Sequence, residues 1–169
     1  MVRYSVRSAG FIGFLAVALA AGAASARPSG RQQVLSEEEV TTERVVELFQ
    51  SALMNVTVDS DGDVVIADGG MRTFIRVDTS RKLISYFSIW PLRSSASEID
   101  RLRLINRLND QLIVVRFSVT QNDHLWCDYQ MSFENGLTSY SIVNAYRLYA
   151  RVVKGAVSTQ DPDDLIGRD

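Results

Sequence analysis

Several residue types are scarce in this chain of 169 residues, and each scarcity limits what the protein can do. Cys127 is the only cysteine, so no internal disulfide can form and stability must come from packing. His124 is the only histidine, so zinc or triad chemistry would depend on that one residue. The 18 basic residues do not outnumber the 20 acidic ones, which removes the counterion-release drive toward nucleic acid.

Catalytic motifs are also missing. The chain has no phosphate-binding loop, dinucleotide fingerprint or paired-cysteine motif. In an extended strand, His124 and Cys127 point to opposite faces, which disfavours a shared zinc site. We therefore predict no catalytic, cofactor-binding or metal-binding residues. A hydrolase using His124 or a carboxylate pair in a cleft stays open as a lesser alternative.

Three alternating acids, Asp59, Asp61 and Asp63, resemble the start of a calcium-binding loop. An EF-hand needs glycine at the sixth position and glutamate at the twelfth, where this chain has Val64 and Gly70. The segment is better interpreted as a solvated hairpin turn.

The N-terminus has the pattern of a cleavable secretory signal. Arg3 and Arg7 form a positive region without acids, and residues 10–24 are an apolar run of about 15 residues, too short for a comfortable membrane span. Ala24-Ser25-Ala26 then provides small residues at the cleavage positions. We predict cleavage after Ala26 and a periplasmic or secreted protein without a membrane span. A retained anchor and cleavage after Ala23 are the alternatives.

The mature chain is predicted to be one domain. Removal of residues 1–26 would leave about 143 residues with a net charge near −4, enough for one ordinary core. We expect a flexible linker at 27–35, a single domain at 36–157 and an acidic disordered tail at 158–169.

The pattern of the domain predicts the order helix, four strands, helix, two strands, helix. The first helix begins at Ser36, which has capping-box spacing to Glu39, or later at Thr41 or Thr42. The second helix is expected to bury the stripe Ile99, Leu102, Ile105 and Leu108. Strands are expected near 55–59, 64–66, 72–77, 82–90, 112–119 and 124–133.

Short turns join most of these strands, so neighbouring strands must be antiparallel. The predicted fold class is α+β, with an antiparallel sheet of five to six strands and three helices packed on one face. In the strand at 124–133, odd-numbered residues share the more apolar face and even-numbered residues share the more polar one.

The domain resembles the YbjN family of bacterial sensory transduction regulators, from about residue 40 to residue 157. The resemblance rests on the sequence VTTERV at 40–45, the DGD hairpin at 61–63, INRLN at 105–109, and Phe117 with the strand through Trp126. It implies a fold similar to type III secretion chaperones, a partner-binding role and a dimeric habit. It implies no catalytic residues. Secretion chaperones hold their clients in the cytoplasm, so the predicted export signal does not fit a chaperone role of that kind.

Two sets of residues are candidates for partner binding. Trp126 lies on the more polar strand face with Asp128 and Gln130, and Arg116 is nearby, so an exposed recognition patch is one interpretation. Packing of Trp126 under a helix or a dimer partner is the other.

Asn106 and Asn109 lie three residues apart on one side of the second helix. Their amides could satisfy the helix end and fix the start of the next strand, or they could form a binding site. Cys127 is interpreted as a small buried hydrophobe, with an intermolecular disulfide as the alternative.

Together these features predict an exported, non-enzymatic binding or regulatory module that holds a protein partner or a second copy. An envelope structural or accessory protein is the alternative.

Overall fold

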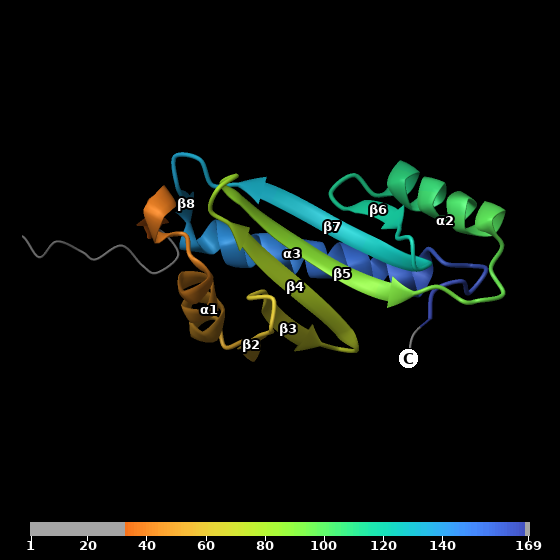
Figure 1. The fold of residues 1–169 in the computed structure, drawn as a ribbon, viewed down its shortest axis with the longest axis horizontal. Helices are drawn as coiled ribbons and strands as arrows, with labels where there is room; N and C mark the ends of the chain where they lie inside the picture. The colour runs from red at the N-terminus through yellow and green to blue at the C-terminus, as the bar shows by residue number, and fades with distance from the viewer. Residues whose placement is uncertain (1–32, 168–169) are drawn as a thin grey trace, which may run out of the picture.

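The computed structural model describes residues 33–167. The predicted signal peptide at 1–26 lies outside the described residues, as do 27–32 and 168–169. Three α-helices occur in the described part, α1 (Thr42–Ser51), α2 (Glu98–Gln111) and α3 (Ser139–Thr159) (Figure 1). The strands are β1 (Val34–Leu35), β2 (Val56–Val58), β3 (Val64–Asp68), β4 (Met71–Asp78), β5 (Leu83–Pro91), β6 (Arg116–Val119), β7 (His124–Ser132) and β8 (Leu137–Thr138).

Six strands form one antiparallel sheet in the order β2-β3-β4-β5-β7-β6. The long strands β5 and β7 pair along their whole lengths at its centre. They are neighbours in space although α2 and β6 lie between them in sequence. The predicted α+β class, with three helices and an antiparallel sheet, is confirmed.

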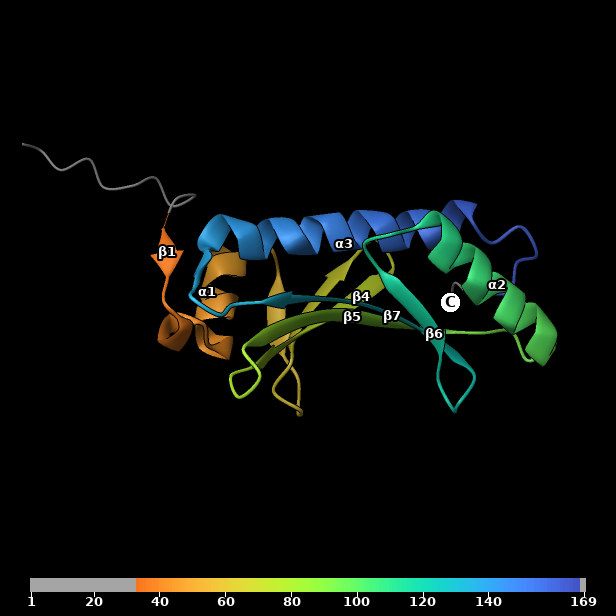
Figure 2. The same ribbon diagram turned by 90° about the horizontal axis from the view of Figure 1, so that it is seen from above.

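The helix α3 lies along one face of the sheet (Figure 2). Its apolar positions recur at helical spacing, so one stripe of the helix is removed from water. No helix within residues 33–167 covers the opposite face, which we call the open face (Figure 2). The buried stripe contains Ile142, Ala145, Tyr146, Tyr149, Val153 and Ala156.

Two tyrosines tie α3 to the sheet through buried hydroxyl groups. The Tyr149 hydroxyl donates to the Cys127 carbonyl at 3.0 Å and lies 2.7 Å from Ser88 Oγ. Because a phenol has one hydrogen, Ser88 is the donor in the second bond. The Tyr86 hydroxyl donates to the Ile142 carbonyl at 2.9 Å. Burial raises the pKa of both phenols, so they remain neutral donors.

Cys127 is fully buried beneath α3, on the odd-numbered face of β7. Desolvation raises the pKa of its thiol to about 12, so the thiolate is not formed at neutral pH. The interpretation of Cys127 as a small buried hydrophobe is confirmed. In this fold its sulfur is not accessible for an intermolecular disulfide.

Both predicted starts of the first helix are used, one after the other. The Ser36 N–H donates to Glu39 Oε2 at 2.7 Å, across a short 3-10 turn at Glu37–Glu39. The α-helix itself begins after Thr41, whose hydroxyl accepts the Arg44 N–H at 3.2 Å. The two caps satisfy N–H groups that a helix start leaves unpaired.

The predicted buried stripe of the second helix is confirmed at Leu108 and Ile105, which lie in or against the core, and was wrong at Ile99 and Leu102. Leu104 and Leu108 are fully buried, whereas Ile99 and Leu102 are 60% and 58% exposed. The sequence contains two overlapping stripes, and the one that includes Leu104 packs against the domain.

The expected termini of the domain also need correction. Val34–Leu35, expected in the flexible linker, pair with Leu137–Thr138 as a small second sheet, and Leu35 is fully buried. Gly136 has φ +85° and lies so close to the Leu35 carbonyl that a Cβ atom would clash with it. Only glycine allows this approach without strain.

The segment at 158–167, expected to be a disordered tail, is ordered. Ser158 and Thr159 finish α3, and Ile166 is fully buried in a bridge to Leu92. Asp161 accepts hydrogen bonds from the backbone of Leu165 and Ile166 at 2.9 and 2.8 Å. The Asp161 carboxylate therefore stabilises a turn in a folded segment. No helix in the described range is long and apolar enough to cross a bilayer.

Candidate functional site on the open face of the sheet

Three aromatic rings cross the open face in a row that we call the aromatic row, Phe74 on β4, Phe87 on β5 and Trp126 on β7. Phe74 and Phe87 are direct cross-strand partners, and their rings stack at 5.2 Å between centroids. Phe87 and Trp126 stack at 4.6 Å with an interplanar angle of 13°. Such offset stacks stabilise a sheet and hold their rings rigidly.

Arginines flank the aromatic row. The Arg72 guanidinium lies 5.4 Å from the Phe74 ring, and the Arg76 guanidinium lies 5.3 Å from the Phe87 ring. Both distances fall in the range of cation–π attraction. Arg72 has no acidic partner among the described residues, which leaves its charge available.

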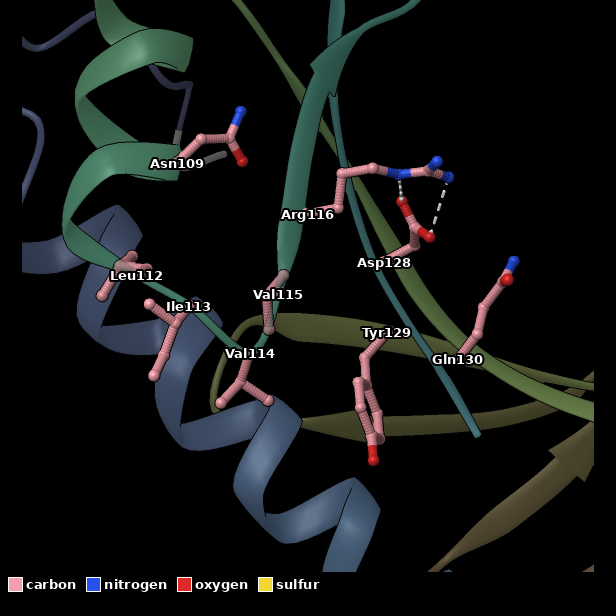
Figure 3. A pocket seen from close by; sticks show the side chains of 9 residues that line it. All are labelled: Asn109, Leu112, Ile113, Val114, Val115, Arg116, Asp128, Tyr129 and Gln130. Atoms are coloured by element: carbon pink, nitrogen blue, oxygen red, sulfur yellow. Dashed lines mark hydrogen bonds and ion pairs between the residues drawn. The ribbon is translucent and has the colours of Figure 1, made fainter. Parts of the chain in front are cut away.

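Two bidentate ion pairs hold Arg76 and Arg116 on this face. Arg76 donates to Asp63 from Nε at 2.8 Å and from Nη2 at 2.6 Å. Arg116 donates to Asp128 at 2.9 and 3.0 Å (Figure 3). The aspartates are buried beneath exposed guanidinium groups, so each charge is compensated and the arginines are held in place.

A hollow of about 190 Å³ lies among these side chains on the open face. It combines flat aromatic surface with donors and acceptors, which is the composition of protein recognition sites. Its lining includes Arg76, Asp78, Arg81, Phe87, Arg116, Trp126, Asp128 and Gln130.

A second groove of about 600 Å³ lies between the segment 112–115 and β7 (Figure 3). Arg116, Asp128 and Gln130 line both this groove and the hollow, so the two depressions adjoin at the Arg116–Asp128 pair. The groove has an apolar wall made by Leu112, Ile113 and Val114.

Four of the predicted partner-binding residues are brought together in the structure. Trp126, Arg116, Asp128 and Gln130 all line the hollow on the open face. Trp126 is half-buried by the aromatic row, and it points to the face of β7 opposite Cys127, which α3 covers. The alternative of packing under a helix is therefore excluded for residues 33–167.

Phe74, Phe87 and Arg76 also belong to this site, although they were not among the predicted site residues. A usable pattern was present, because Arg72, Phe74 and Arg76 are alternate residues of one strand and must share one of its faces. What the pattern lacks is the register that sets Phe74 opposite Phe87.

The two predicted asparagines do not belong to this site as a pair. Asn109 donates from Nδ2 to the Phe117 carbonyl and accepts from the Phe117 N–H, both at 3.0 Å. Its amide imitates a neighbouring strand and fixes the start of β6, so the structural interpretation of Asn109 is confirmed. Asn106 is exposed, and its side chain makes no hydrogen bond to another described residue.

Replacing Asn109 with alanine should leave the Phe117 N–H and carbonyl unpaired and lower the free energy of unfolding by about 2 kcal/mol. Asn106→Ala is the matched control on the same helix face and should change stability by less than about 0.5 kcal/mol. Urea denaturation followed by circular dichroism measures both. Equal stability of the two variants would contradict the structural role of the Asn109 hydrogen bonds to Phe117.

The remaining candidates for chemistry are occupied by local structure. His124 Nδ1 lies 2.7 Å from the Asn122 carbonyl at the start of β7. In the 59–63 turn, the Asp59 carboxylate accepts the N–H groups of Asp61 and Asp63 at 3.0 and 2.9 Å. Among residues 33–167, no group of three or more histidine, cysteine or acidic side chains is arranged to hold a metal ion.

The described elements define a small α+β domain in which helices cover one face of an antiparallel sheet and the other face stays open. The chain belongs to the YbjN family, whose model, described as "Putative bacterial sensory transduction regulator", matches residues 41–158. The resemblance inferred from the sequence is thereby confirmed.

Three solved structures are similar to this chain. YbjN from E. coli, described as "a putative transcription regulator", is 13% identical, with a TM-score of 0.66 over 76% of this chain and 96% of its own. A chain of the HopA1-SchA chaperone–effector complex is 11% identical, with a TM-score of 0.48 over 64% of this chain and 86% of its own. The third is the Yersinia pestis type III secretion chaperone SycH in complex with a stable fragment of YscM2. It is 15% identical, with a TM-score of 0.44 over 71% of this chain and 97% of its own. No curated protein matches the chain significantly.

Proposed function

We propose that this protein is an exported, non-enzymatic binding or regulatory module that holds a protein partner on the open face of its sheet. The observation that carries the proposal is the aromatic row among arginines on that face, in which Phe74 and Trp126 keep part of their surface exposed on either side of the buried Phe87. Tryptophan, tyrosine and arginine are the residues that most often dominate the energy of protein interfaces.

The charge pattern favours a protein over a nucleic acid as the partner. Arg76, Arg81 and Arg116 each have an aspartate partner on the same face, so the surface presents mixed charge instead of a basic stripe. Nucleic-acid sites concentrate uncompensated positive charge. The formal net charge of −2 for the whole chain points the same way.

Trp126→Ala should weaken partner binding by about tenfold or more, because it removes an anchor of the open face. Protein purified gently from the envelope fraction of its own host is compared by native mass spectrometry with and without the substitution. Tyr140→Ala is the matched control, because Tyr140 is 48% exposed but begins α3, outside the open face. Equal partner retention by both variants would contradict the proposed site.

Export is the second part of the proposal and has a separate test. It is supported by the positive start, the apolar run at 10–24 and the Ala24-Ser25-Ala26 sequence. The same purification gives the intact mass of the protein. A mass that lacks residues 1–26 supports export, whereas the mass of all 169 residues overturns it.

A further inference from the structure

The strand β7 has a free edge that its neighbour does not cover. On one side β7 pairs with β5 as far as Ser132, opposite Leu83. On the other side its pairing with β6 stops at Asp128, opposite Arg116. Within residues 33–167, the four residues 129–132 are therefore paired on one side only. We call them the β7 overhang.

The ladder itself shows which backbone groups face this free edge. The Phe133 N–H donates to the Lys82 carbonyl on the β5 side, at 2.9 Å, and the Thr120 N–H donates to the His124 carbonyl on the β6 side, at 2.8 Å. Backbone groups of successive strand residues point to alternate sides. Even-numbered residues of β7 therefore direct their N–H and C=O toward β6, and Gln130 and Ser132 direct theirs to the free edge.

The chain before β6 diverges from β7 and opens the groove beside the overhang. The α2 helix draws residues 112–115 away from the line of β6, which leaves the groove of about 600 Å³ (Figure 3). Its wall carries Ile113, whose side chain is 95% exposed, and its end is formed by the Arg116–Asp128 pair. An apolar residue so exposed beside unpaired strand groups is unusual for a finished sheet edge.

From these features we infer that the β7 overhang is a strand-addition site, which takes an extended segment of the partner protein into the groove in line with β6. The inference rests on the proposed protein-binding function and states how part of the partner is held. Only an extended chain offers alternating acceptors and donors at the spacing of Gln130 and Ser132.

The groove also specifies the chemistry of the segment. Tyr129 and Gln130 point to opposite sides of β7, so successive residues of an added strand meet different surroundings (Figure 3). Residues on the side of Tyr129 and Leu112 meet apolar surface, and those on the open face meet Gln130 and Arg116. The segment should therefore alternate apolar residues with polar or acidic ones.

Gln130→Pro tests the site directly. Proline removes the Gln130 N–H, which faces the free edge, and spares the bonds to β5 that odd-numbered residues make. Gln130→Ala is the matched control, because it removes the side chain and keeps the N–H. Ile113→Asp tests the apolar wall, and its matched control is Ile99→Asp, which changes another exposed isoleucine away from the groove.

The probe is a set of 12-residue peptides selected from a random phage-displayed library on the wild-type residues 27–169. We expect selected peptides to alternate as described and to lose about tenfold or more affinity for Gln130→Pro and Ile113→Asp, with the two controls unchanged. Thermal unfolding must show that each variant stays folded. In amide hydrogen exchange, bound peptide should also slow Gln130 and Ser132.

The possible failures are distinguishable. Peptides that bind Gln130→Pro as tightly as the wild type, but lose binding with Trp126→Ala, would overturn strand addition and leave the open-face proposal standing. Peptides indifferent to both substitutions would overturn both. Selection of no peptide would overturn strand addition. A wild-type dimer that becomes a monomer with Gln130→Pro would assign the edge to a second copy and overturn the inference of a partner segment.

Discussion

Replacing Tyr149 with alanine is expected to lower the free energy of unfolding by about 4 kcal/mol. The ring of Tyr149 is fully buried between α3 and the sheet, and its hydroxyl links the Cys127 carbonyl to Ser88. The substitution therefore leaves a cavity and removes a hydrogen-bond partner from two buried groups. Urea denaturation of the folded domain, followed by circular dichroism, measures the loss.

Two control variants separate the parts of this effect. Tyr149→Phe keeps the ring and removes only the hydroxyl, so about 1–2 kcal/mol should be lost. Tyr140→Ala removes a half-exposed tyrosine of the same helix and should cost less than about 0.5 kcal/mol. If Tyr149→Ala were no more destabilising than Tyr140→Ala, the packing of α3 on the sheet would be wrong.

The second large effect is expected at Ile166. Ile166→Ala should destabilise the protein by about 3 kcal/mol, because the side chain is fully buried and its backbone forms a bridge to Leu92. Ile113→Ala is a control of the same chemical change at a position that is 95% exposed. Thermal unfolding should show a clear loss for the first variant and almost none for the second. Equal melting temperatures would mean that the segment after α3 does not contribute to the core.

The order and type of the main elements could be predicted because their patterns are local. Alternation in β7 placed Cys127 and Trp126 on opposite faces, and helical spacing placed Leu108 on the buried side of α2. Each of these inferences needs only one element and its period.

Errors arose where one pattern allowed two answers. In α2 the stripes through Leu102 and Leu104 are both apolar at helical spacing, and only tertiary contact decides between them. After α3, acidic residues hide Ile166 in a segment without periodicity, so nothing local indicates that its side chain is buried. Similarly, Val34 and Leu35 are too short a run to predict a strand whose partner lies at 137–138.

The candidate site was predicted only in part because its residues are brought together by the pairing register of several strands. Trp126, Asp128 and Gln130 lie on one strand and follow from alternation alone. Phe74 and Phe87 join them through cross-strand pairing over several turns, and Arg76 reaches Asp63 in the same way. A one-residue slip in any of these pairings would have separated the row.

The position of α3 in the chain has a consequence for the order in which the protein matures. Every strand of the six-stranded sheet precedes residue 133, whereas the helix that covers it begins at Ser139 and the Ile166 anchor follows later. When the polypeptide is synthesised from its N-terminus onward, the apolar face of the sheet therefore stays exposed until α3 is available to cover it. During that interval the nascent protein is vulnerable to aggregation and proteolysis.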